Sequence, residues 1–142
     1  MDKFRIADLG AGNAESMIEV VASDKNAIAA EDREDMEKLT YGDESFDMVH
    51  CRNALDHTKD ALAAVKEMIR ICKPGGWVYI KCWLDQKSTK GHHYWSAKDD
   101  GIFTNGVDSF DLKDLGFKIR YTDIGGERRY NYIEATLEKP NA

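Results

Sequence analysis

The stretch Asp8-Leu9-Gly10-Ala11-Gly12 decides the fold. It closes an apolar run that begins at Phe4, and a short apolar run followed by glycines predicts a buried strand, Phe4–Leu9, and a tight turn. Glycines at such a turn let backbone amides approach a ligand closely. The signal is weak when taken alone, so the segments that follow it determine the interpretation.

Strands and helices alternate along the first half of the chain. We expect strands at Ile18–Ala22, Ser45–Cys51 and Trp77–Trp83, and a helix at Lys59–Cys72. The spacing of the helix places one set of apolar residues on a single face, namely Leu62, Val65, Ile69 and Cys72. Lys73-Pro74-Gly75-Gly76 ends the helix, because proline cannot continue it and glycine permits a reversal. Alternation of this kind predicts a mainly parallel sheet.

The second half begins with a polar, irregular connection from Leu84 to Asn105, a length that is typical of functional or mobile loops. A short helix is expected at Ser109–Leu115, followed by strands at Phe117–Ile124 and Tyr130–Leu137. Residues 125–129 are short enough to join these two strands as an antiparallel hairpin, which would give the sheet one antiparallel edge strand.

Length and composition indicate one globular domain over residues 1–142, with 42% hydrophobic and 32% charged residues. The net charge of −6 argues against a general affinity for nucleic acid, whose phosphates require Lys and Arg. A local basic patch stays possible, but nucleic acid is not indicated as a partner.

Cys51, Cys72 and Cys82 lack the spacing of metal ligands and are expected to be small buried thiols in a reducing cytosol. The adjacent His92 and His93 have no second cluster of ligands, so we expect no metal site. The amino terminus lacks the apolar run of a signal peptide, and no segment reaches membrane-spanning length. These features predict a cytoplasmic protein that does not bind a membrane.

Four segments, in order, resemble the class I S-adenosylmethionine-dependent methyltransferases, and most closely the branch called type 11. They are Asp8–Gly12, Asp24 at a strand end, Ser45–Val49, and Lys73–Trp77. The resemblance covers roughly residues 4–83, and the terminal hairpin fits the reversed last strand of that family. It implies an α/β, Rossmann-like fold with a mainly parallel sheet and an antiparallel C-terminal hairpin strand. It also implies S-adenosylmethionine as the cofactor.

The resemblance assigns cofactor-binding roles residue by residue. The glycine turn, Gly10, Ala11 and Gly12, would pass beneath the methionine and ribose groups, with Asp8 bracing it. Asp24 would accept hydrogen bonds from the two ribose hydroxyls, since its two oxygens suit a vicinal diol. The remaining positions are Asp35 and Met36 at the adenine, and Cys51 and Arg52 at the methionine end. Simpler interpretations stay open: Asp24 as a turn cap and Asp35 as one charge in a solvated acidic run.

Methyl transfer to an acceptor that the sequence does not name is the expected activity. His57 follows the strand at Ser45–Cys51 and is either a candidate base or a histidine that stabilises its turn. His92 and Tyr94 lie in the long polar connection beside the expected acceptor site. A degenerate domain that binds the cofactor or a partner protein without catalysis is the alternative. A nicotinamide enzyme is disfavoured, because Glu15 stands where that class has a further glycine and would repel a pyrophosphate.

The chain departs from the family in its early helices. Only six residues separate Gly12 from Glu19, fewer than two helical turns, and the segment after Asp24 is also short. The helix that usually precedes the first strand is missing as well. One face of the sheet would therefore lack its helices, so either a second copy of the chain covers that apolar face or the short segments rearrange over it. We expect a homo-oligomer, most simply a dimer, with an interface that includes residues before position 35.

Overall fold

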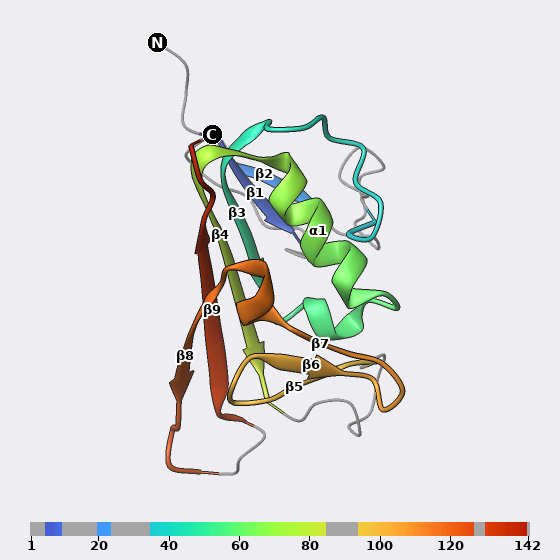
Figure 1. The fold of residues 1–142 in the computed structure, drawn as a ribbon, viewed down its shortest axis with the longest axis vertical. Helices are drawn as coiled ribbons and strands as arrows, with labels where there is room; N and C mark the ends of the chain where they lie inside the picture. The colour runs from blue at the N-terminus through green and yellow to red at the C-terminus, as the bar shows by residue number, and fades with distance from the viewer. Residues whose placement is uncertain (1–4, 10–19, 24–34, 85–93, 127–129, 142) are drawn as a thin grey trace.

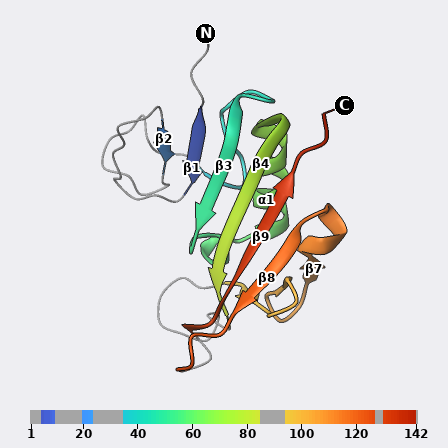
Figure 2. The ribbon, with the colours of Figure 1, turned by 90° about the vertical axis from the view of Figure 1, so that its left-hand side faces the viewer.

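The computed structural model describes residues 5–9, 20–23, 35–84, 94–126 and 130–141. These residues form a six-stranded sheet in the order β2-β1-β3-β4-β9-β8, with one helix packed behind it (Figures 1 and 2). The strands are β1 (Ile6–Leu9), β2 (Val20–Ser23), β3 (Phe46–Arg52), β4 (Cys72–Trp83), β8 (Lys118–Thr122) and β9 (Tyr132–Glu138).

The directions of the strands confirm a mainly parallel sheet. β2, β1, β3 and β4 run parallel, whereas β9 runs antiparallel to both β4 and β8. The expectation of an antiparallel strand at the edge is wrong in one respect. The antiparallel strand β9 lies inside the sheet, between β4 and β8, and β8 forms the edge. The α/β class and the antiparallel C-terminal hairpin strand are both confirmed.

Helix α1 (Ala61–Ile71) covers one face of β3 and β4 (Figure 1). The side chain of Asp60 caps it by accepting a hydrogen bond of 3.0 Å from the backbone of Ala63. Its buried residues follow the helical repeat and are Ala61, Ala64, Val65, Met68 and Ile71. The helix therefore lies where it was predicted, except that it is shorter at both ends and β4 begins at once at Cys72. The predicted apolar face is wrong in part, because Leu62 and Ile69 are only half-buried and the buried face is the one listed above.

The core lies between α1 and one face of the sheet. Alternate residues of β4 and β9 are buried there, namely Val78, Ile80, Cys82, Ile133, Ala135 and Leu137. Figure 2 shows the opposite face, over which the described residues place no helix. Trp77 and Trp83 of β4 are 46% and 39% exposed on that face.

This open face corrects one expectation and agrees with another. Among the described residues, helix α1 lies on one face only, in agreement with the expected reduction of helices on the other; the early segments at 10–19 and 24–34 lie outside the described residues. The strands, however, are not apolar on both sides, since β3, β4 and β9 present His50, Lys81 and Glu134 on the open face between their buried residues. A mixed face of this kind costs less free energy to expose than a wholly apolar one.

A second, three-stranded sheet lies beyond the carboxyl end of β4 (Figure 1). It consists of β5 (Ser96–Ala97), β6 (Ile102–Thr104) and β7 (Ser109–Asp111). The predicted helix at Ser109–Leu115 is wrong over its first half, because only Leu112–Leu115 is helical, as a 3-10 turn. Stacking of Phe110 on Phe103, with ring centroids 5.7 Å apart, favours the strand pairing.

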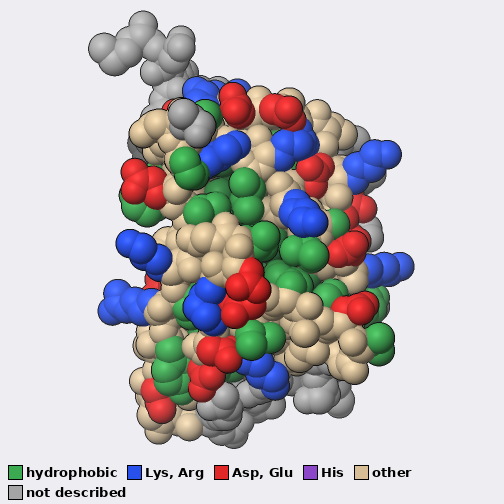
Figure 3. All heavy atoms as spheres, viewed as in Figure 1, with side chains coloured by type: hydrophobic (Ala, Val, Ile, Leu, Met, Phe, Trp, Pro, Cys, Tyr) green, Lys and Arg blue, Asp and Glu red, His purple; other side chains and the backbone are tan. Residues whose placement is uncertain are grey.

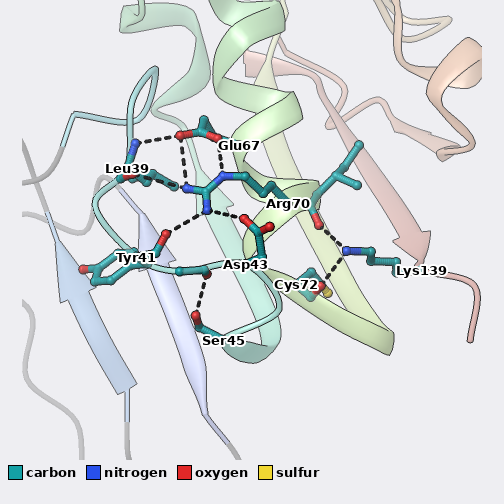
Figure 4. A network of polar contacts seen from close by, with 10 residues as sticks. Leu39, Tyr41, Asp43, Ser45, Glu67, Arg70, Cys72 and Lys139 are labelled. Atoms are coloured by element: carbon teal, nitrogen blue, oxygen red, sulfur yellow. Dashed lines mark hydrogen bonds and ion pairs between the residues drawn. The ribbon is translucent and has the colours of Figure 1, made fainter.

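Arg70 of α1 joins the segment before β3 to the helix (Figure 4). Its guanidinium group donates to Glu67 at 2.6 Å, to Asp43 at 2.8 Å, and to the carbonyl oxygens of Leu39 and Tyr41. The hydrogen bond to Arg70 lowers the pKa of Glu67, and the same bond raises the pKa of Arg70. Arg70 therefore joins the backbone and side chains of residues 39–43 to helix α1.

The surface on the side of α1 mixes both signs of charge. Figure 3 shows Lys, Arg, Asp and Glu interspersed there with apolar side chains, without a large basic area over the described residues of this side. In the described part of the chain, every helix is too short or too polar to cross a membrane.

Candidate functional site

The order of the strands defines where a ligand is expected. From β1 the chain first adds β2 on one side and later adds β3 on the other, so the direction of winding reverses at β1. Open α/β sheets bind ligands outside the carboxyl ends of the strands at such a reversal. Gly10, Ala11 and Gly12 follow β1 at this point, and Asp24 follows β2, but all four lie outside the described residues.

Asp8, on the open face near the end of β1, contacts the neighbouring strand. Its Oδ1 lies 3.1 Å from Nδ1 of His50, and the His50 ring stacks on Tyr79 with ring centroids 5.2 Å apart. The two side chains are 26% and 30% exposed. Asp8 is thus fixed to β3 directly before the glycine turn, and His50 is a residue that the sequence did not single out.

The carboxyl end of β3 carries the other predicted positions. The side chain of Cys51 is fully buried, and burial, together with the nearby carboxylates of Asp56 and Asp8, raises the pKa of its thiol. Cys51 can therefore face a ligand only through its backbone. Arg52 is exposed at the last position of the strand.

Asn53 follows directly and has a left-handed backbone with φ of 52°. Its backbone amide donates to the carbonyl oxygen of Lys81 at 2.7 Å, yet its side-chain Oδ1 is buried and has no hydrogen-bond partner among the described residues. A buried acceptor without a donor is costly unless a ligand supplies one. S-adenosylmethionine carries an ammonium group and hydroxyls that can donate, so this end of β3 fits such a ligand chemically.

The loop after β3 meets the segment that precedes β5. Leu55–His57 forms a 3-10 turn, and the carbonyl oxygen of Asp56 accepts from the backbone amides of Tyr94 and Trp95 at 2.8 and 3.2 Å. Nε2 of His57 lies 3.9 Å from the buried Asp56 carboxylate. The structure therefore places both His57 and Tyr94 next to Asp56, whereas His92 lies outside the described residues.

Asp35 and Met36 lie on a turn beside that loop. Oδ1 of Asp35 accepts from the backbone amide of Glu37 at 2.9 Å, and Asp35 is an exposed residue. The carboxylate of Glu37 in turn accepts from the amides of Lys59 and Asp60. Met36 is half-buried against the core. The turn is thus attached to the connection between the 3-10 turn and α1.

Comparison with known structures supports the fold. A methyltransferase of Methanosarcina mazei described as SAM-dependent superposes with a TM-score of 0.60 and 14% identity, over 100% of this chain and 95% of that one. The [4+2]-cyclase SpnF superposes with a TM-score of 0.62 and 18% identity, over 99% of this chain and 76% of that one. Since these identities are low and the two proteins differ in reaction, they establish the fold alone.

Sequence comparison identifies the family. A demethylmenaquinone methyltransferase of Mycobacterium sp. (strain KMS) is 34% identical over 92 residues, which cover 54% of this chain and 40% of that protein. The chain thus spans less than half the length of this curated relative. The family model described as a methyltransferase domain, of type 11, matches residues 8–80, from the end of β1 through β4. The chain therefore belongs to the methyltransferase domain family of type 11, class I methyltransferases whose cofactor is S-adenosylmethionine.

Proposed function

We propose that the protein transfers a methyl group from S-adenosylmethionine to an acceptor at the carboxyl ends of β1 and β3. The unpaired, buried Oδ1 of Asn53 at this position carries the proposal, because it provides an acceptor for a cofactor group. Gly10, Ala11 and Gly12 would form the turn beneath the cofactor, and Asp8 at the end of β1, bonded to His50 of β3, would brace that turn. Asp24 would bind the ribose hydroxyls.

The adenine would lie against Met36, with the carboxylate of Asp35 as the acceptor for its amino group. Arg52 and the backbone of Cys51 would lie at the methionine end, next to Asn53. These assignments place the cofactor across the turn at residues 35–38 and the end of β3.

The bound cofactor supplies an electrophilic methyl group on a sulfonium. The protein has to hold the acceptor nucleophile in line with that methyl group and to remove its proton where the nucleophile is weak. We assign the removal of the acceptor's proton to Nε2 of His57. The His57 side chain is 43% exposed and lies beside the buried carboxylate of Asp56. Tyr94 and His92 would line the acceptor side of the site.

Demethylmenaquinone is the first acceptor to test, since it gives the 34%-identical relative its name. Other small molecules and exposed groups on polymers are the next candidates. We further propose that the protein acts in the cytoplasm, in keeping with three free, buried thiols, and that it forms a homodimer.

Calorimetric titration with S-adenosylmethionine, S-adenosylhomocysteine and NAD tests the cofactor assignment. S-adenosylmethionine and S-adenosylhomocysteine are expected to bind, and NAD is not. Asp24→Ala should weaken the binding of both ligands by at most about 1.5–3 kcal/mol per lost hydrogen bond. Asp114→Ala removes an exposed carboxylate on the 3-10 turn after β7 and is the matched control. Equal affinity of parent and Asp24→Ala protein would overturn the ribose assignment.

Activity is measured separately, as methylated demethylmenaquinone detected by mass spectrometry. His57→Gln should lower the rate without changing cofactor affinity, because it removes the base alone. Tight cofactor binding without any methylated product, in this assay and with cell extracts as acceptor source, would point to a binding module instead.

A further inference from the structure

The centre of the open face carries two opposite charges on adjacent strands. Strands β4 and β9 lie side by side in the sheet (Figure 2). Lys81 of β4 is in register with Glu134 of β9, and two residues along β4 Trp83 is in register with Tyr132. All four residues belong to the face opposite α1. The open face therefore presents a charged pair of positions next to an aromatic pair.

Lys81 and Glu134 are not bonded to each other. Nζ of Lys81 lies 4.3 Å from the centroid of the Tyr132 ring, and Oε2 of Glu134 accepts from the hydroxyl of Tyr79 at 2.7 Å. Among the described residues neither charge forms an ion pair. Directly opposed charges on neighbouring strands usually interact across the sheet. Here each is turned to a different tyrosine, so both remain available to a partner.

The aromatic side chains of this face are unusually exposed for their size. Trp77 and Trp83, at either end of this part of β4, are 46% and 39% exposed, and Tyr130, which packs edge-on against Trp83, is 40% exposed. Trp, Tyr and Arg are the residues enriched at protein–protein interfaces. The composition of the open face is thus that of a contact surface.

We propose that this face binds a second copy of the chain about a two-fold axis that runs between β4 and β9, parallel to them. Such an axis places each Lys81 opposite the partner's Glu134 and each Trp83 opposite the partner's Tyr132. Both contacts occur twice, as an isologous interface requires. Two sheets stacked face to face lie about 10 Å apart, a distance that these long side chains span.

The charge pattern favours a second copy over an unrelated partner. Lys81 and Glu134 lie side by side on one chain. A two-fold axis between them therefore brings each residue opposite the oppositely charged residue of the second copy, so the surface is complementary to itself. The inference names the surface of the proposed dimer and does not rest on methyl transfer. It also moves the expected centre of the interface from the residues before position 35 to β4 and β9.

The same axis places β3 over the partner's β8, and so Arg52 near the partner's Arg120. Both side chains are exposed in the single chain. Like charges in apposition weaken an interface. The substitution Arg120→Glu should therefore lower the dissociation constant of the dimer. A dimer formed through another surface would not show this increase in affinity.

Sedimentation velocity over a range of concentrations tests the proposal. The parent chain should show a concentration-dependent monomer–dimer equilibrium. Lys81→Glu and Glu134→Lys should each raise the dissociation constant by about tenfold or more, since each places like charges together. An equimolar mixture of these two variants should recover the parent affinity, because every charge then meets its opposite. Arg120→Glu should lower the dissociation constant.

Lys66→Glu makes the same change of charge on the exposed side of α1 and is the control. Circular dichroism checks that each variant is folded. A parent chain that stays monomeric would overturn the dimer itself. A dimer that Lys81→Glu and Glu134→Lys affect no more than Lys66→Glu would overturn this surface. Neither result bears on calorimetric binding of S-adenosylmethionine, whose failure would count against the proposed function alone.

Discussion

Oδ1 of Asp8 lies 3.1 Å from Nδ1 of His50, and this contact joins β1 to β3, two neighbouring strands that lead to the expected cofactor site. Asp8 is separated from Gly10 by one residue, and His50 precedes Arg52 by two. The bond therefore connects the strand that leads into the glycine turn with the strand that ends beside the methionine position. Stacking of His50 on Tyr79 extends the connection to β4.

A double-mutant cycle on this pair should reveal the connection. Asp8→Asn and His50→Leu should each lower the free energy of unfolding, and the double variant should lose less than the sum, with a coupling of about 0.5–1 kcal/mol. Urea unfolding of the four proteins gives the values. Strict additivity would show that the two side chains do not stabilise each other.

Substitution of Asn53 should lower cofactor affinity without lowering the stability of the fold. Asn53→Gly keeps a residue that readily adopts the left-handed backbone and removes the buried, unpaired Oδ1. The melting temperature should be unchanged or raised, whereas affinity for S-adenosylmethionine should fall about tenfold, the loss of one hydrogen bond from a charged donor.

Asn53→Asp is the matched variant, because it retains an acceptor and tolerates the same backbone. It should bind the cofactor at least as well as the parent in the same calorimetric titration. If Asn53→Gly binds the cofactor with parental affinity, the ligand does not use Oδ1.

Glu67 should make the stability of the protein depend on pH in the acid range. Its pKa is lowered in the folded protein, chiefly by the hydrogen bond from Arg70, so the unfolded chain takes up a proton first. The stabilisation is thus present above the pKa of an unfolded Glu and is lost as pH falls through the lower, folded value. Thermal unfolding from pH 6 downwards should show this decline.

Glu67→Gln should have lower stability at neutral pH and a flatter profile in the acid range. The variant should also expose the segment before β3 to proteolysis, since Glu67 accepts from the backbone of Leu39 and aligns Arg70 (Figure 4). Parallel acid profiles for parent and variant would show that this carboxylate is not the responsible group.

Local patterns in the sequence were sufficient for the elements with a clear period. The helix at 59–72 and the strands around β3, β4 and β9 follow from apolar spacing, and α1 and the sheet confirm them. The helix expected at Ser109–Leu115 failed, since the packing of Phe110 on Phe103 and Trp95 overrides local preference.

Some residues of the candidate site could likewise be predicted from the sequence, and others could not. The residues that follow strand ends, such as Arg52, could be placed by their position in the chain. The partnership of Asp8 with His50 depends on the register of two strands 42 residues apart, and no local pattern specifies that register. That Oδ1 of Asn53 has no partner among the described residues likewise follows only from the three-dimensional arrangement of its neighbours.

Gly76 should be the glycine of this sheet that tolerates a side chain least. A Cβ added there would lie 2.5 Å from the carbonyl oxygen of Asp47 and 2.9 Å from Sγ of Cys72, at the point where the register of β3 and β4 shifts. The backbone of β4 can approach β3 so closely only without a side chain. Gly76→Ala should therefore lower the free energy of unfolding by about 1–3 kcal/mol, the usual cost of overpacking.

Gly126, in the turn between β8 and β9, provides the control. An added Cβ there meets no atom within 4 Å, so Gly126→Ala should leave stability unchanged or raise it slightly by restricting the unfolded chain. Urea unfolding of both variants gives the comparison. Because Gly76 lies against the backbone of Asp47 in β3, its substitution should also weaken the pairing of β4 with β3, and cofactor affinity should fall with it. Equal stability of the two alanine variants would mean that the strands separate there at no cost, and that the close approach of β3 and β4 does not position the site.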